Sequence, residues 1–145
     1  MRHSENSSML NKKTQYALQA LQYLIEHKTE GPILIAQIAT KKQIPLKFLE
    51  NILLELKKME VLSSKKGKGG GYFINQEAVH TPLAKIIRNI EGPIAMLPCA
   101  SLNFYERCEN CDEKNCGLHA TMVAVRDATL KVLGSKTVSD LANLV

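Results

Sequence analysis

The residues with the most evident chemistry lie in one stretch near the C-terminal end of the chain. Residues 99–119 read CASLNFYERCENCDEKNCGLH and contain every cysteine of the protein. Thiols crowded together in this way can hold a metal ion or an iron–sulfur cluster, form a disulfide framework, or act as a redox dithiol. We call this stretch the cysteine loop, and its potential ligands are Cys99, Cys108, Cys111, Cys116 and His119.

The spacing of these residues is Cys-x8-Cys-x2-Cys-x4-Cys-x2-His. Structural zinc sites usually combine two C-x2-C pairs, or one such pair with two histidines, and this loop has a single pair, Cys108 and Cys111. A thioredoxin-type dithiol requires a neighbouring βαβ unit, which the sequence does not indicate. Iron–sulfur clusters accept irregular thiolate spacing and a histidine in place of a cysteine. Spacing by itself leaves an iron–sulfur cluster and zinc as open alternatives.

Composition indicates an ordinary globular protein. The 145 residues are 45% hydrophobic and 23% charged, enough for one domain or for a small domain with an appended helical piece. No apolar run approaches the roughly 18 residues of a membrane span, so the sequence predicts no membrane partner. The first eight residues, MRHSENSS, lack the apolar core of a secretion signal, and we expect residues 1–8 to form a disordered polar tail. A cytoplasmic location follows, where thiol clusters more often bind metal or undergo redox chemistry than form structural disulfides.

The positive charge of the chain is concentrated in one segment. Between Lys41 and Lys68 there are eight lysines and three glutamates, which accounts for the whole formal net charge of +5. A basic segment on an otherwise neutral body favours a polyanionic partner, most plausibly double-stranded DNA. A solvated lysine-rich face is the alternative on charge alone.

The same segment has the pattern of a helix-turn-helix. Apolar residues at helical spacing predict a helix over residues 10–27, a short helix over 33–43 and a third helix over 45–59. On the third helix the outward face contains Lys47, Glu50 and Asn51. Lysines suit phosphates, whereas Asn and Glu pair with adenine and cytosine edges in the major groove. An amphipathic core helix with a solvated polar side would show the same pattern.

The residues that follow favour the DNA-binding interpretation. Val61 and Leu62 can begin a strand, Tyr72–Ile74 can form its partner, and a lysine- and glycine-rich turn lies between them. A basic hairpin directly after a recognition-type helix is the wing of a winged helix, whose tip lies near phosphates or the minor groove. The candidate wing residues are Lys65, Lys66, Lys68 and Gly69.

The C-terminal part is predicted to contain a helix from Thr81 to Gly92, the cysteine loop, and a helix over residues 119–134 that is apolar on more than one face. A small protein cannot bury such a helix alone, which indicates a partner subunit. The predicted fold is therefore mainly α: a winged helix-turn-helix with a β-hairpin wing over residues 9–80. Residues 81–145 add a linker helix, the cysteine-rich loop and a long dimerisation helix.

Four motifs in this sequence resemble the IscR/NsrR-type winged-helix transcriptional regulators, the Rrf-two family. They are TQYALQAL in the first helix, IPLKFLENILLELKKMEVL, KKGKGGGYFI, and IIRNIEGPI before the cysteines. The C-x-x-H of Cys116 and His119 leads into a long helix, as it does in the IscR branch. The resemblance covers about residues 9–135.

This resemblance implies a homodimeric, non-enzymatic regulator whose DNA binding is controlled by a 2Fe–2S or 4Fe–4S iron–sulfur cluster. By position, three ligands are Cys99, Cys108 and Cys116. The fourth ligand is open between His119, which we favour, Cys111, and a group from the partner subunit.

This chain departs from the family pattern in its cysteine spacing and its first helix. The gaps between the three matching cysteines are eight and seven residues, wider than usual in the family, and Cys111 is an extra thiol. Gln15 stands where some members have a carboxylate ligand. Two other interpretations of the loop remain: a zinc-stapled or metal-free thiol switch on the same fold, and, remotely, a thiol oxidoreductase using Cys108 and Cys111.

Overall fold

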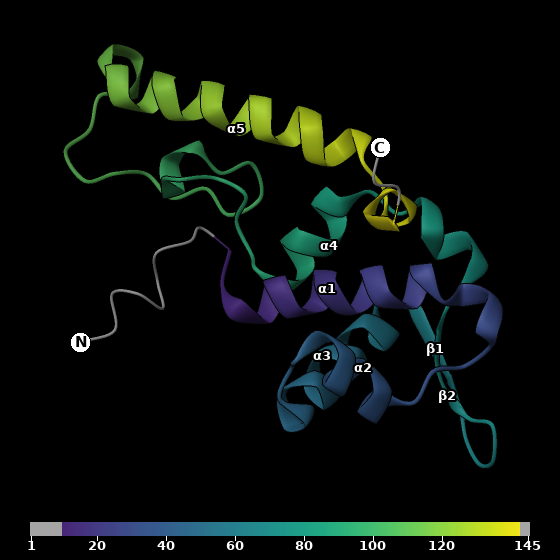
Figure 1. Ribbon diagram of the computed structural model, residues 1–145. Coiled ribbons are helices and arrows are strands. Elements are labelled where there is room, and N and C mark those ends of the chain that lie inside the picture. Colours follow the sequence, from purple (N-terminus) through teal and green to yellow (C-terminus); the bar gives the residue numbers. More distant parts are fainter. Residues whose placement is uncertain (1–9, 143–145) are drawn as a thin grey trace. The chain divides into compact units, whose positions relative to one another are not determined.

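A computed structural model describes residues 10–142, so the tail predicted at residues 1–8 lies outside the described part (Figure 1). The chain divides into two compact units. Among the described residues, the first unit contains 10–81 and 137–142, and the second contains 82–136. The chain therefore leaves the first unit after residue 81 and returns to it at residue 137.

The first unit is organised around helix α1 (Lys12–Glu26). Asn11 caps its N-terminus, because the Asn11 Oδ1 atom accepts a hydrogen bond from the backbone N–H of Thr14 at 2.9 Å. The helical spacing of apolar residues places Ala17, Leu21 and Leu24 in the core, where α1 contacts α2 (Ile35–Lys42) and α3 (Leu46–Lys58).

The predicted helix-turn-helix is confirmed. Helix α2 is followed by its C-cap residue Gln43, which adopts a left-handed conformation with φ of 55°. The next residue, Ile44, is buried and donates its N–H to the Ala39 carbonyl at 2.9 Å. Pro45 is the N-cap residue of α3 and precedes its first residue, Leu46. The buried stripe of α3 is Leu49, Ile52, Leu53 and Leu56.

The predicted wing is also confirmed. Strand β1 (Leu62–Lys65) pairs antiparallel with β2 (Gly71–Ile74), with Leu62 opposite Ile74. The turn between the strands uses Gly67 and Gly69 at φ of 85° and 74°, a region that favours glycine. With five α-helices and a two-stranded sheet among the described residues, the fold is mainly α, as the sequence predicts.

The C-terminal segment packs in the first unit. A 3-10 turn at Val138–Ala142 contacts α1 and the 3-10 turn Gln76–His80. Val138 is fully buried, and its N–H donates to the Thr81 carbonyl at 3.0 Å. The sequence-based division places this segment with residues 81–145, whereas burial of Val138 joins it to the winged helix.

The second unit consists of α4 (Leu83–Ile90), an irregular segment with 3-10 turns at Pro98–Ala100 and Glu113–Asn115, and α5 (Gly117–Ser135). Helix α5 contacts α4 and the first of these turns. It begins two residues before the predicted start, because Cys116 caps it. In the part of the chain that the structure describes, no residue of α5 is buried, and no helix is long and apolar enough to cross a membrane.

Candidate nucleic-acid interface and metal centre

The structure brings the three predicted base- and phosphate-contacting residues of α3 onto one outward surface. Lys47 is 92% exposed in its side chain, and its Nζ atom lies 3.5 Å from the Glu50 Oε2 atom. Asn51 is exposed on the adjacent turn. An exposed ion pair of this kind contributes little to stability. The Lys47–Glu50 contact can therefore break at little cost, which leaves both side chains available to bind groups of a nucleic acid.

Two other polar contacts hold α3 in place. Lys13 on α1 bonds to the Glu55 carboxylate, and Lys57 donates to the Ser64 Oγ atom at 2.7 Å. The second bond ties the end of α3 to β1 of the wing. Lys57 thus has a positioning contact in addition to its charge.

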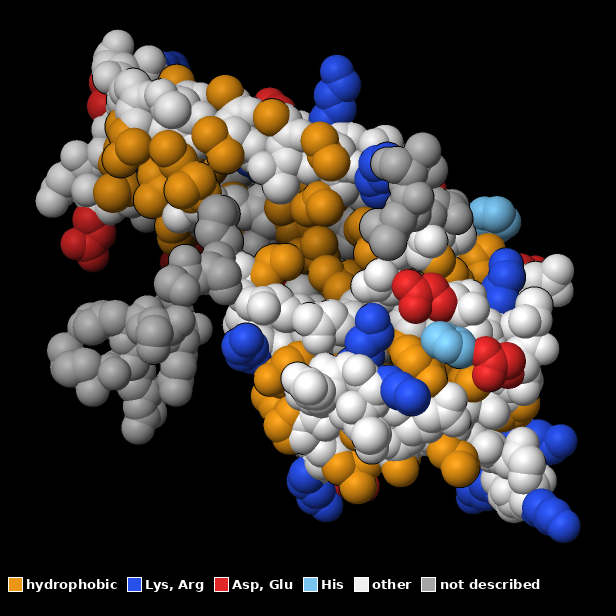
Figure 2. All heavy atoms as spheres, in the orientation of Figure 1, with side chains coloured by type: hydrophobic (Ala, Val, Ile, Leu, Met, Phe, Trp, Pro, Cys, Tyr) orange, Lys and Arg blue, Asp and Glu red, His pale blue; other side chains and the backbone are white. Residues whose placement is uncertain are grey.

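The wing presents its basic residues to solvent. Lys65, Lys66 and Lys68 are exposed, and Gly69 lies between them and the second strand. Within residues 10–142 none of these three lysines forms an ion pair. Figure 2 shows basic side chains projecting at the hairpin tip. A polyanion that contacts this tip meets ammonium groups without competing carboxylates.

The wing is anchored by a contact that sequence reasoning missed. Ile33, in the segment between α1 and α2, exchanges two backbone hydrogen bonds with Tyr72, at 2.8 and 2.7 Å. A Cβ atom on Gly71 would lie 2.4 Å from the Ile33 carbonyl oxygen, so only glycine permits this approach. The sequence feature that could have indicated this contact is the third consecutive glycine, Gly71, because glycine inside a strand often marks a close approach of another backbone segment.

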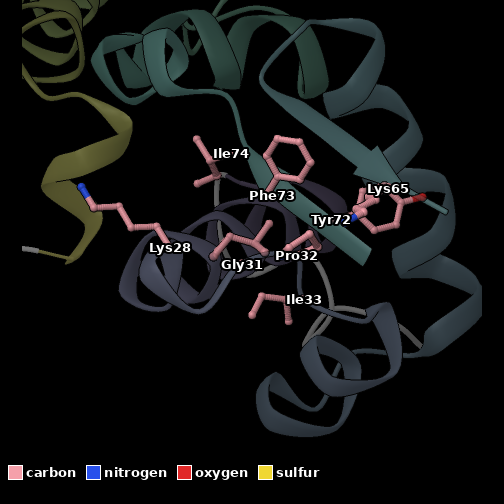
Figure 3. Close-up of a pocket in the computed structure, with 9 residues that line it drawn as sticks. Lys28, Gly31, Pro32, Ile33, Lys65, Tyr72, Phe73 and Ile74 are labelled. Atoms are coloured by element: carbon pink, nitrogen blue, oxygen red, sulfur yellow. The ribbon is translucent and has the colours of Figure 1, made fainter. Parts of the chain in front are cut away.

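A small cavity lies beside this anchor (Figure 3). It has a volume of about 320 Å³ and lies between residues 28–33 and the hairpin. Its lining is mostly apolar and includes Ile33, Tyr72 and Ile74. The wing therefore contacts the rest of the unit through the Ile33–Tyr72 bonds and this partly hollow apolar base, in addition to the contact of β1 with α3.

In the second unit, three of the predicted ligands lie together. The Nδ1 atom of His119 is 3.3 Å from the Cys99 Sγ atom, and the backbone N–H of His119 donates to the Cys116 Sγ atom at 3.3 Å. The second contact is the N-cap of α5, so Cys116 and His119 are fixed by the start of the helix.

The position of Cys99 depends on Arg126, a residue that sequence reasoning did not single out. The Nη1 atom of Arg126 on α5 donates to the Ala100 carbonyl at 2.9 Å. The following residue, Ser101, is buried and accepts a hydrogen bond from the Phe104 N–H at 2.9 Å. These bonds hold the turn that contains Cys99 against α5. The sequence feature that could have indicated this role is that Arg126 is the only arginine in an otherwise largely apolar helix.

The other two cysteines differ in their exposure. Cys108 is exposed and Cys111 is half-buried, and all four thiols of the described chain are free of disulfide bonds. Partial desolvation, then the neighbouring Cys116 and Cys108 thiols, raise the pKa of the Cys111 thiol above its ordinary value. Cys108 and Cys111 both line a surface hollow formed by residues 107–112.

The donor types fit an iron–sulfur cluster or zinc, because thiolates and imidazole are the ligands both prefer. Across residues 10–142, however, no group of three or more His, Cys, Asp or Glu side chains is arranged around a common metal position. Cys99 and Cys116 both contact His119, whereas Cys108 and Cys111 line a surface hollow formed by residues 107–112. Gathering the ligands around one cluster would therefore require movement of the segment 107–112, which contains Cys108 and Cys111.

Comparison with known proteins gives consistent results. The family model of the Rrf2 iron-dependent transcriptional regulators matches residues 10–144. An rrf2-like HTH-type transcriptional regulator of Rhodobacter capsulatus is 36% identical over 137 residues, covering 92% of this chain and 91% of the relative. The HTH-type transcriptional regulator IscR of Photorhabdus laumondii is 29% identical over 134 residues, covering 92% of this chain and 79% of the relative.

Solved structures show the same fold. CymR, the global cysteine regulator of B. subtilis, superposes with a TM-score of 0.75 at 28% identity, covering 93% of this chain and 96% of that chain. IscR of T. potens superposes with a TM-score of 0.72 at 24% identity, covering 94% and 87%.

Proposed function

Because this chain belongs to the Rrf2 family of transcriptional regulators, we propose that it is a homodimeric DNA-binding regulator controlled by an iron–sulfur cluster in its cysteine loop. Its relatives are transcriptional regulators and not enzymes, so the thiol oxidoreductase interpretation of Cys108 and Cys111 is set aside. The observation that best supports cluster control is that Cys99, Cys116 and His119 lie in contact at the start of α5.

In this proposal α3 enters the major groove as the recognition helix. Lys47 contacts phosphate, while Glu50 and Asn51 meet base edges. Lys65, Lys66 and Lys68, with Gly69 allowing close approach, contact the DNA backbone beside the groove. The three wing lysines are exposed and form no ion pair within residues 10–142, which supports this arrangement.

Replacing Lys66 by alanine is expected to weaken binding to all DNA sequences alike, because a phosphate contact carries no sequence information. The dependence of log K on log salt should become shallower by about 0.9 for each phosphate that the variant no longer neutralises. Fluorescence anisotropy over a range of salt concentrations measures both quantities.

Asn51→Ala is the contrasting variant. It should cost about 1–3 kcal/mol at one base position, and relax preference there, without altering the salt slope. If both variants lost affinity equally on every sequence, the proposed division between base and phosphate contacts would be wrong.

The homodimer is proposed from the exposed apolar residues of α5. Leu118 and Val132 are 59% and 56% exposed, and Val125 is 37% exposed. Each is seven residues from the next, the spacing that forms a seam between two paired helices. Figure 2 shows hydrophobic side chains exposed along this helix. A second copy of the chain would cover the seam with its own α5.

Val125→Glu is expected to convert the dimer into a monomer. A carboxylate without a partner in the middle of the buried seam would cost about 3–5 kcal/mol. Sedimentation equilibrium measures the change. Ala120→Glu is the matched control, since it adds the same charge to an exposed residue on another side of α5. A Val125→Glu protein that remains as dimeric as the control would place the interface elsewhere.

The proposed cluster ligands are Cys99, Cys108 and Cys116, with His119 or the alternative Cys111 as the fourth. When bound, the cluster would supply an iron centre that responds to oxidants, nitric oxide or iron supply. The residues around the cluster would have to transmit the presence or absence of the cluster to the DNA-binding helices. Cys116 caps α5 and Cys99 is tied to α5 through Arg126, so ligand movement would act on the proposed dimer helix. The distance between the two recognition helices of the dimer would then change. Because these helices must match half-sites about 34 Å apart, the affinity for DNA would change with it.

The test is the visible absorption spectrum of protein purified without oxygen, with iron, acid-labile sulfide and zinc assayed on the same sample. The proposal expects a coloured protein with iron and sulfide. A colourless protein that takes up neither after anaerobic reconstitution would contradict cluster control and leave the DNA-binding function in place.

A zinc-stapled or thiol-switched loop is the second candidate. It is favoured by Cys108 and Cys111, two free thiols separated by two residues, because a C-x2-C pair can form a disulfide or supply two ligands to a tetrahedral zinc site. Stoichiometric zinc, or a peroxide-dependent loss of two free thiols in the colourless protein, would support this candidate instead.

A further inference from the structure

The outward surface of α3 has an apolar side chain at its centre. Leu54 is 49% exposed, and at about 100° per residue it lies roughly opposite the buried stripe of the helix. Leu46, the first residue of α3, is 45% exposed. With Glu50 between them, Leu46 and Leu54 form a row at i, i+4 and i+8, beside a second row that contains Lys47 and Asn51.

Single exposed leucines are common and need no special explanation. Here, however, two of them flank the residues that carry the proposed base contacts, on a helix whose surroundings are strongly basic. A polyanion that binds this face would remove both leucines from water. DNA presents one apolar group in its major groove, the C5-methyl group of thymine.

We propose that Leu46 and Leu54 are specificity-determining residues that contact thymine methyl groups in the operator. This inference rests on the proposed entry of α3 into the major groove and adds a class of base readout that the polar residues cannot provide. Glu50, which lies between the leucines, accepts from a cytosine amino group in the same scheme.

The helix geometry limits where the thymines lie. Eight residues separate Leu46 from Leu54, which corresponds to about 12 Å along the helix axis. At about 3.4 Å per base pair this spans at most about 4 base pairs. Two methyl-dependent positions should therefore occur about 3–4 base pairs apart in each half-site, with the Glu50- and Asn51-dependent positions between or beside them.

The experiment combines side-chain and methyl-group deletion. A random-sequence duplex pool is selected with the full chain, in its anaerobically reconstituted and metal-free forms. Each thymine of the selected half-site is then replaced singly by deoxyuridine, which removes only the methyl group. Affinities are measured for the wild type, Leu54→Ala and Leu46→Ala. Leu34→Ala is the matched control, since Leu34 is 60% exposed but precedes α2 and is not on α3.

For each leucine, the half-site should contain one thymine whose replacement by deoxyuridine lowers the affinity of the wild type about fourfold. This is the factor expected when one methyl-sized group is no longer buried. Leu54→Ala should bind thymine and uracil equally at one of these positions and keep the wild-type ratio at the other, with the reverse for Leu46→Ala. The control should keep both ratios. Thermal unfolding checks that each variant remains folded.

Equal affinity of the wild type for thymine and uracil throughout the half-site would overturn the inference, as would wild-type ratios in both α3 variants. In either case the selected DNA would still support the proposed function. If neither form of the protein enriched any sequence, the proposed function and this inference would fail together.

Discussion

Gly71→Ala should produce a protein whose wing is released and whose affinity for DNA falls about tenfold or more, with its base preference unchanged. The new Cβ atom would lie 2.4 Å from the Ile33 carbonyl oxygen and 2.5 Å from its carbon. Both are backbone atoms, which cannot rotate away as a side chain can. Relief therefore requires that the two Ile33–Tyr72 hydrogen bonds break.

The size of the effect follows from these bonds and from the backbone conformation. Two backbone hydrogen bonds contribute about 1–3 kcal/mol together. The φ of 143° at Gly71 adds a strain of about 1–3 kcal/mol for any residue with a side chain. The free energy of unfolding should fall by about 2–6 kcal/mol, the sum of the two contributions. The salt dependence of DNA binding should become shallower as the wing lysines lose their fixed position.

Denaturant unfolding and anisotropy titrations test this prediction. Gly67→Ala is the matched control in the same hairpin: its φ is 85°, and no described atom lies within 4 Å of the new Cβ position. The control carries the strain of a positive φ without the collision. If the two variants matched in stability and DNA affinity, the Ile33–Tyr72 bonds would not be what positions the wing.

Cys116→Ser is expected to abolish iron and sulfide binding while leaving α5 intact. Cys116 is both a proposed ligand and the N-cap of α5. Serine is a preferred N-cap residue, so its hydroxyl keeps the hydrogen bond from the His119 N–H. It is a poor replacement for a thiolate ligand, because iron–sulfur clusters are held mainly by thiolates. This substitution separates the two roles of the residue.

The measurements are iron and sulfide per chain, the visible spectrum, and helical content by circular dichroism. Cys111→Ser and His119→Ala, made separately, then distinguish the two candidates for the fourth ligand. The ligand assignment would be refuted by a Cys116→Ser protein that retains a full complement of iron. Loss of helical content in that variant would show that the thiol has a structural role that serine does not replace.

Much of the DNA-binding fold was predictable from the sequence because its signals are local. The apolar periods of α1 and α3 and the glycine-rich hairpin each depend on residues within one helical turn or one strand of each other. The concentration of lysines between residues 41 and 68 needs no structure to be recognised. The family followed from the same motifs and is confirmed by the match over residues 10–144.

The arrangement of the candidate metal centre could not be predicted in the same way. Cys99 and His119 are in contact across 20 residues of mostly irregular chain, and Ala100 and Arg126 across 26. Irregular loops have no period from which a side-chain direction can be read. The pairing of Cys99 with His119, and the exposure of Cys108, therefore emerged only from the folded loop.

The sequence by itself determined which elements form, where the basic charge lies, and that every thiol belongs to one loop, since each depends on neighbouring residues. Only the tertiary structure decided that Ile33 anchors the wing through Tyr72, that residues 137–142 return to the winged helix, and that Arg126 holds the turn of Cys99. These contacts join residues distant in the chain. Their formation depends on burial and backbone approach in the assembled fold, which local patterns do not encode.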